Sequence, residues 1–189
     1  MSTSSTTPLA GIDLPEPGTY AIDPTHSTLV VVARHLMVAK VRGYFTELDG
    51  TVTVADDPLA SSVEVTVKAS SIDTRDEQRD AHLASADFLD VENHPDIRFR
   101  STGLEHAGGT SFRLSGELTI RGVTRPVVAD LEYLGRTGDP WGGTRIAFEA
   151  RGEIDREEFG VTWNAALETG GVVVGKKLTF EFDVEAVKQ

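Results

Sequence analysis

The stretch Val63-Glu64-Val65-Thr66-Val67-Lys68-Ala69 decides the fold class, because apolar and polar residues alternate along it without interruption. A period of two is that of a β-strand with one buried and one solvated face, whereas an amphipathic helix repeats every 3.6 residues. The stretch therefore predicts an extended strand whose inward face carries Val65 and Val67.

The same alternation recurs from residue 18 onward. The further candidate strands are residues 19–23, 28–34, 41–54, 97–101, 112–120, 127–133, 146–151 and 178–184. Glycine pairs such as Gly108-Gly109 and Gly170-Gly171 separate several of these runs, which is typical of hairpin turns. Many short strands joined by tight turns favour an antiparallel barrel or sandwich.

Helix signals are few. Thr74-Arg75-Asp76-Glu77 has the spacing of a capping box and predicts a helix from about residue 76 to 85. The segment from Asp155 to Gly160 predicts a single helical turn, with Asp155 as its N-cap and Gly160 at its end. The predicted fold class is therefore all-β with one short helix.

The inward faces of the strands mix large residues with small ones such as Gly116, Ala129, Ala150 and Gly152. An eight-stranded barrel has an interior that is either just filled by side chains or just wide enough for one small ligand. The alternation alone leaves a packed core and a cavity equally open. The small residues favour the cavity.

Composition excludes several classes of function. The chain has 189 residues, with 18 Lys and Arg against 30 Asp and Glu, and a formal net charge of −12. This charge disfavours nucleic acid and anionic membrane surfaces as partners. No apolar run approaches the roughly 20 residues of a membrane-spanning helix, so no stable membrane insertion is expected. The absence of cysteine excludes disulfides, thiolate nucleophiles and cysteine metal sites.

Residues 1–17, MSTSSTTPLAGIDLPEP, contain no Lys or Arg and no apolar core of the length that a signal peptide needs. Their Ser, Thr and Pro content is typical of a flexible segment. The sequence therefore predicts a disordered lead-in over residues 1–17, a barrel domain over residues 18–189 and a cytoplasmic location.

The sequence argues against three kinds of chemical motif. Residues 170–176 match the phosphate-binding pattern G-x-x-x-x-G-K, but Lys177 stands where that loop needs a Ser or Thr, and a strand follows where it needs a helix. The five histidines show neither H-x-H nor H-x-x-x-H spacing, and no G-x-S-x-G is present. We therefore expect no cofactor, no metal and no catalytic residue.

Six stretches, in this order and at these spacings, resemble the YceI-like family of lipocalin-like, polyisoprenoid-binding proteins. They are residues 20–27 (YAIDPTHS), 35–45 (HLMVAKVRGYF), 79–91 (RDAHLASADFLDV), 94–101 (HPDIRFRS), 118–127 (LTIRGVTRPV) and 155–160 (DREEFG). The likeness runs from about residue 18 to residue 188.

This resemblance implies an elongated eight-stranded antiparallel lipocalin-like β-barrel with an apolar tunnel. The implied ligand is an isoprenoid or similar long-chain amphiphilic lipid, held without catalysis in a carrier, storage or stress-related role. The expected tunnel-lining residues are Phe45, Val65, Val67, Phe99, Phe112, Leu114, Leu118, Phe148, Trp163 and Phe180.

Specificity for one lipid would have to come from its head group, because one methylene more or less changes binding in an apolar pocket only about 10–200-fold. Arg34, His35 and Arg42, near the start of the barrel, are the candidate head-group contacts, and their alternative is plain surface charge. A filled-barrel interaction protein and an enzyme acting on an isoprenoid remain as alternative functions. The sequence also leaves a homodimer open.

Overall fold

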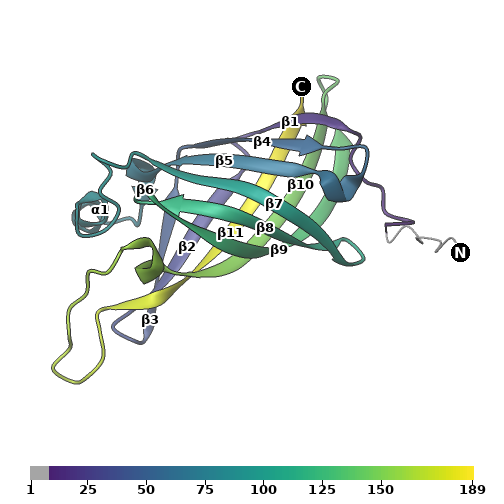
Figure 1. Ribbon diagram of the computed structural model, residues 1–189. Helices are drawn as coiled ribbons and strands as arrows, with labels where there is room; N and C mark the ends of the chain where they lie inside the picture. Colours follow the sequence, from purple (N-terminus) through teal and green to yellow (C-terminus); the bar gives the residue numbers. More distant parts are fainter. Residues whose placement is uncertain (1–8) are drawn as a thin grey trace, which may run out of the picture.

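Residues 9–189, which this computed structural model describes, form antiparallel strands that wrap around a common interior (Figure 1). The strands are β1 Gly18–Ile22, β2 Thr28–His35, β3 Ala39–Phe45, β4 Leu48–Val54, β5 Ser62–Lys68, β6 Ile72–Asp73, β7 Asp96–Gly108, β8 Ser111–Ile120, β9 Val123–Gly138, β10 Thr144–Asp155 and β11 Val174–Lys188. One α-helix, α1 Glu77–Ala84, and the 3-10 helices Pro58–Ala60 (η1), Ala69–Ser71 (η2) and Arg156–Phe159 (η3) complete this part of the chain.

Eight of these strands close into a ring. Their hydrogen-bonded order is β1-β4-β5-β7-β8-β9-β10-β11, and β11 pairs back with β1 through Tyr20 opposite Lys188. Closure leaves no unpaired edge within the ring, which is how such barrels avoid edge-to-edge association. The predicted eight-stranded antiparallel barrel is confirmed.

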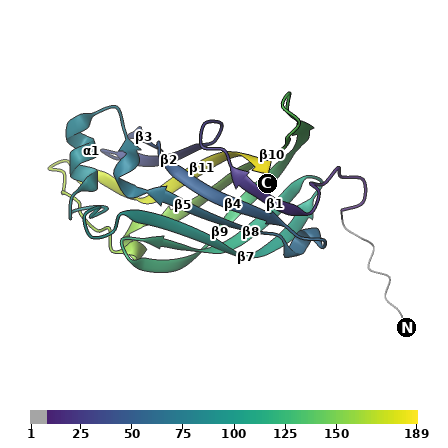
Figure 2. The same cartoon turned by 90° about the horizontal axis from the view of Figure 1, so that it is seen from above.

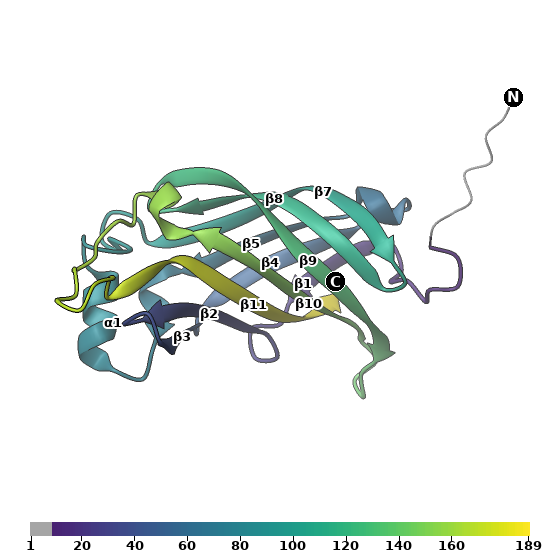
Figure 3. The ribbon, with the colours of Figure 1, turned by 90° about the horizontal axis from the view of Figure 1, so that it is seen from below.

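The strand β11 is shared between two neighbours. Its C-terminal end pairs with β1, whereas its earlier part pairs with β2 from Asp183 to Leu178 and, past an irregularity, through Val174. Beyond β2, the strands β3 and β6 extend the sheet outside the ring. Figure 3 shows β3 at the end of the barrel that carries α1. The predicted run over residues 41–54 is therefore two strands, β3 and β4, which have different partners.

The single helix lies where the sequence predicted it, but its cap differs. Asp76 is the N-cap, and its Oδ1 accepts a hydrogen bond from the Arg79 amide at 2.9 Å. Thr74 is instead buried and bonds through its hydroxyl to Asp80 at 2.6 Å. The expected single turn is η3, capped by Asp155 and ended by Gly160 with φ of 76°. No helix within residues 9–189 is both long and apolar enough to cross a membrane.

Residues 9–17 lie against the barrel, although the sequence assigned them to a disordered lead-in. Leu9 is only 5% exposed, and the Asp13 carbonyl accepts a hydrogen bond from the Tyr133 hydroxyl at 3.0 Å. The Tyr20 hydroxyl donates to the Glu16 carbonyl at 2.8 Å. The apolar residues within this polar segment therefore pack over the end of the barrel opposite α1 (Figure 2). Residues 1–8 lie outside the described part of the chain.

Candidate ligand-binding cavity

A cavity of about 280 Å³ lies inside the barrel. Leu14 and Pro15 line it near the N-terminal segment, and Leu89 and Leu178 line it toward the α1 end. Between these ends, each strand of the ring other than β1 contributes two or more inward side chains to the lining. Strand β1 contributes Ile22. The alternation that predicts the strands therefore also builds the wall of this cavity.

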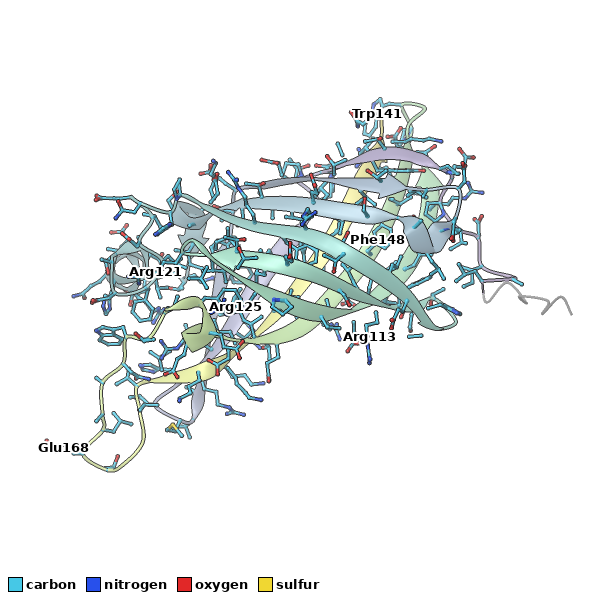
Figure 4. All side chains as sticks on the ribbon, in the orientation of Figure 1. Arg113, Arg121, Arg125, Trp141, Phe148 and Glu168 are labelled. Atoms are coloured by element: carbon cyan, nitrogen blue, oxygen red, sulfur yellow. The ribbon has the colours of Figure 1, made fainter. Side chains whose placement is uncertain are left out.

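Nine of the ten residues expected to line a tunnel do line this cavity. They are Phe45, Val65, Val67, Phe99, Phe112, Leu114, Leu118, Phe148 and Phe180. Phe45 belongs to β3, so the sheet extension outside the ring also contributes to the wall. Figure 4 labels Phe148 on β10 within the barrel.

Trp163 lies beside the cavity rather than on its lining. Its ring meets the His82 ring edge-on at 4.7 Å and lies tilted against Phe88 at 5.3 Å. These contacts hold it in a second apolar cluster around the buried Phe159 and Val161. The connection after η3 thus packs its tryptophan on α1 and its following turn, because those side chains offer an apolar surface outside the barrel.

The three expected head-group contacts also lie off the cavity lining. Arg34 and Arg42 are exposed on the β2–β3 hairpin, and half-buried His35 ends β2 opposite Val174. Their odd spacing from Val31 and Phe45 explains this for the arginines, since residues an odd number apart on a strand face opposite sides. The cavity wall and these cations therefore lie on opposite faces of the same two strands.

Small residues keep the middle of the cavity open. Gly116 and Gly152 face two phenylalanine rings, and an added Cβ at Gly152 would lie 2.5 Å from the Phe180 ring carbon Cζ. An added Cβ at Gly116 would clash with the Phe99 ring in the same way. Because neither glycine has a side chain, both rings lie flat against the wall instead of projecting inward.

The cavity lining carries no charged side chain among the described residues. Its polar side chains are the hydroxyls of Ser61, Ser62 and Tyr133. Burial, assisted by the nearby Asp13 carboxylate, raises the pKa of Tyr133 to about 12, so this phenol is neutral at ordinary pH. The arrangement can hold an apolar molecule by contact and water exclusion, and it offers no acid–base pair within the cavity.

Comparison with known proteins identifies the family of this chain. The sequence profile of the YceI-like domain matches residues 20–186. The chain belongs to the YceI-like family. A UPF0312 protein of Serratia proteamaculans is 39% identical over 146 residues, which is 76% of each chain. Protein YceI of Escherichia coli O157:H7 is 38% identical over 145 residues, or 75% of each chain.

Solved structures agree with this family assignment. A YCEI protein from Campylobacter jejuni superposes with a TM-score of 0.69 at 26% identity, over 82% of this chain and 90% of that one. Two more distant structures show the same fold. Burkholderia cenocepacia BcnA has a TM-score of 0.76 at 21% identity, covering 87% and 98% of the two chains. A polyisoprenoid binding domain from Saccharophagus degradans has a TM-score of 0.70 at 12% identity, covering 92% and 100%.

Sequence reasoning missed one residue that organises the α1 end of this YceI-like barrel. Arg156 is 3% exposed, and its guanidinium donates to the carbonyls of Val161, Trp163 and Gly175, each at 2.9 Å, and of Val174 at 3.3 Å. Burial lowers the pKa of Arg156. The only sequence signal for Arg156 is its place inside the DREEFG stretch, residues 155–160, which is also the expected turn.

One group of potential metal ligands occurs in the described part of this YceI-like chain. Asp23, His26 and Glu185 bring their ligand atoms within 4.8 Å of one another. Arg145 already supplies a cation there, because its Nη1 lies 2.9 Å from Asp23 Oδ2 and 2.6 Å from Glu185 Oε1. The Thr25 hydroxyl, followed by Arg145 and His26, holds the pKa of Asp23 well below its usual range. The group is therefore an ion-pair network between β1, β10 and β11.

Proposed function

We propose that this YceI-like protein binds a long-chain isoprenoid or a similar amphiphilic lipid, with the apolar tail inside the barrel and without chemical conversion. The observation that carries the proposal is the cavity inside the barrel, whose lining among residues 9–189 is apolar apart from three hydroxyls. The Saccharophagus degradans domain with the same fold is named for binding a polyisoprenoid, which supports the choice of ligand class.

The dimensions of the cavity support a long ligand. On β8 its lining runs from Phe112 to Ile120, which is about 26 Å along the strand at about 3.3 Å per residue. A strand tilt of roughly 40° reduces this to about 20 Å along the barrel axis. Each buried methylene contributes about 0.8 kcal/mol, so a chain of that length binds tightly without specific polar contacts.

The same features argue against the two alternatives. A filled barrel would have no such cavity, whereas here the small residues on β8, β9 and β10 leave one. An enzyme acting on an isoprenoid would need ionisable groups converging on the ligand, and the described lining has none with a charge. A carrier or storage role needs only reversible burial of the tail.

The test starts with native mass spectrometry of the protein purified from its own host, followed by extraction and identification of any bound lipid. Ala129→Phe then fills the cavity, since Ala129 is 5% exposed and lines it. The matched control is Val128→Phe, because the adjacent Val128 is 50% exposed and faces outward.

We expect the Ala129→Phe protein to lose its bound lipid and the Val128→Phe protein to keep it, with both still folded by circular dichroism. Equal lipid occupancy in the two variants would contradict binding inside the barrel. An absence of extractable lipid, together with no uptake of a fluorescent long-chain fatty acid by the wild type, would contradict the proposed function altogether.

A further inference from the structure

The tip of the β2–β3 hairpin exposes three consecutive apolar side chains. Leu36 is 42% exposed, Met37 57% and Val38 78%. Single exposed apolar residues are common on protein surfaces, but a contiguous group at the end of a projecting hairpin indicates a contact surface. The hairpin and the adjacent loop, residues 161–173, project together from the α1 end of the barrel (Figure 1).

The backbone at this tip adopts a turn that its side chains disfavour. Leu36 and Met37 have φ of 52° and 66°, and the His35 carbonyl accepts a hydrogen bond from the Val38 amide at 3.1 Å. Two successive residues with positive φ form the kind of hairpin turn that prefers Asn-Gly, because other L-residues are strained there. Apolar side chains thus occupy this tip against local backbone preference, as occurs where a site has a function.

Three cations share one face of the hairpin directly behind the tip. Arg34 lies opposite Lys40 in the strand register, and Arg42 follows Lys40 by two residues, so all three side chains point to the same side. All three are exposed, and none forms an ion pair with any residue among 9–189. Like charges directly opposite one another destabilise a strand pair, so this arrangement does not serve the fold.

The surroundings keep this positive patch distinct. The Leu36 amide donates to the Val173 carbonyl at 2.9 Å, which fixes the neighbouring loop against the hairpin. That loop carries one acid, Glu168, at its far end (Figure 4). Nearby Glu157 and Glu153 already pair with Lys176 and Lys177 at 3.0 and 2.7 Å.

We propose that the β2–β3 hairpin docks the protein reversibly on an anionic lipid bilayer. Leu36, Met37 and Val38 enter the boundary between head groups and acyl chains, while the three cations behind them pair with lipid phosphates. Val31 and Phe45, on the inner face of the same strands, line the cavity. Docking therefore brings that end of the cavity to the bilayer surface.

The overall charge of −12 does not oppose this contact. The strand β11 runs 15 residues from beside the hairpin to the opposite end, about 50 Å along the chain at about 3.3 Å per residue. The Debye length is only about 8 Å at physiological ionic strength, so charges at the far end are screened from a surface touching the hairpin. Exposed acids also lie at the same end, among them Asp73, Asp76 and Glu77 on β6 and at the start of α1, but the hairpin tip projects away from α1 (Figure 1). The unpaired cations of the hairpin are therefore the charges that would lie nearest the bilayer.

The test is co-sedimentation of the full-length protein with two kinds of vesicle, phosphatidylcholine alone and an equal mixture of phosphatidylcholine with phosphatidylglycerol. We expect binding to the anionic vesicles, weakened by added salt. Each cation near such a surface strengthens binding about fivefold, so the triple variant Arg34→Gln, Lys40→Gln and Arg42→Gln should bind roughly 100-fold more weakly.

The sharper variant is Leu36→Asn with Met37→Gly. It removes two apolar side chains and installs the residues that this turn prefers, so the fold is kept or stabilised while vesicle binding is lost. Trp141→Ser and Arg113→Gln are the matched controls, because Trp141 is 84% exposed on the β9–β10 turn, Arg113 is exposed on β8, and both lie away from the hairpin (Figure 4). Both should bind vesicles as the wild type does.

Three results would overturn the docking proposal. The first is wild-type protein that ignores the anionic vesicles. The second is binding that the hairpin variants leave unchanged or that the controls reduce equally. The third is self-association through the hairpin, seen by analytical ultracentrifugation as a dimer that the Asn-Gly variant abolishes, without vesicle binding. None of these results depends on which lipid the cavity holds, so the docking and lipid-binding proposals fail separately.

Discussion

Replacement of Arg156 by Met should destabilise the barrel strongly, although no acidic partner is lost. Methionine retains much of the apolar stem but removes the donors to four carbonyls, of which Val174 O keeps a second donor in Asn164 Nδ2 at 2.7 Å. The other three lose a charge-assisted hydrogen bond worth about 1.5–3 kcal/mol each, partly offset because no guanidinium need be desolvated. We expect a net loss of about 2–4 kcal/mol.

Urea unfolding and thermal melting measure this loss, which for a chain of this size corresponds to a fall in Tm of about 10 °C. Arg151→Met is the matched control. Arg151 is exposed on β10, pairs with Glu149 at 2.6 Å and should contribute less than about 1 kcal/mol. Hydrogen exchange in residues 161–174 should accelerate only in the Arg156 variant. If both variants lose equal stability, the buried guanidinium does not anchor the loop and our reasoning is refuted.

Two further outcomes are expected. Gly152→Ala should turn the Phe180 ring into the cavity, lowering lipid occupancy in native mass spectrometry and costing about 1–3 kcal/mol in urea unfolding; unchanged values for both would contradict the packing described above. Because Thr25 and Arg145 lower the pKa of Asp23 in the folded state, its contribution to stability is present above an unfolded pKa of about 3.9 and is lost as pH falls below it. Asp23→Asn should flatten that acid dependence in urea titrations, and a pH profile identical to that of the wild type would exclude the network as its source.

Alternation predicted the strands and the inward residues because both depend on a local property, the period of two. It could not show that β11 serves two neighbours, since sharing a strand depends on where β1 and β2 meet it, between 139 and 168 residues away in sequence. It also read residues 41–54 as one strand, although the inward positions change from odd-numbered, such as Phe45, to even-numbered, such as Val52 and Val54. This shift of phase is the sequence signal that the strand ends near Thr46.

The cavity wall was predictable for the same reason, but its ends were not. The composition of the N-terminal segment hid that Leu14 and Pro15 line the cavity and that the segment accepts hydrogen bonds from Tyr20 and Tyr133, because these neighbours come together only in the folded barrel. Trp163 was assigned to the tunnel because large apolar faces near a barrel mouth commonly contact ligands. In the structure, the Trp163 ring packs against His82 and Phe88 instead. These two residues belong to α1 and the turn after it, which are distant in sequence.

The strand that closes the ring, β11, is also the last of the described strands to be synthesised. Until residues 174–188 emerge, β10, β2 and β1 each lack the partner that β11 supplies. A nascent chain therefore carries three open strand edges and an unclosed apolar lumen, the features that promote aggregation during synthesis. Because Tyr20 pairs with Lys188, 168 residues further along the chain, we expect closure to be a slow, late step of folding. Deletion of residues 185–188 should then harm the protein in the cell far more than the small number of atoms removed would suggest.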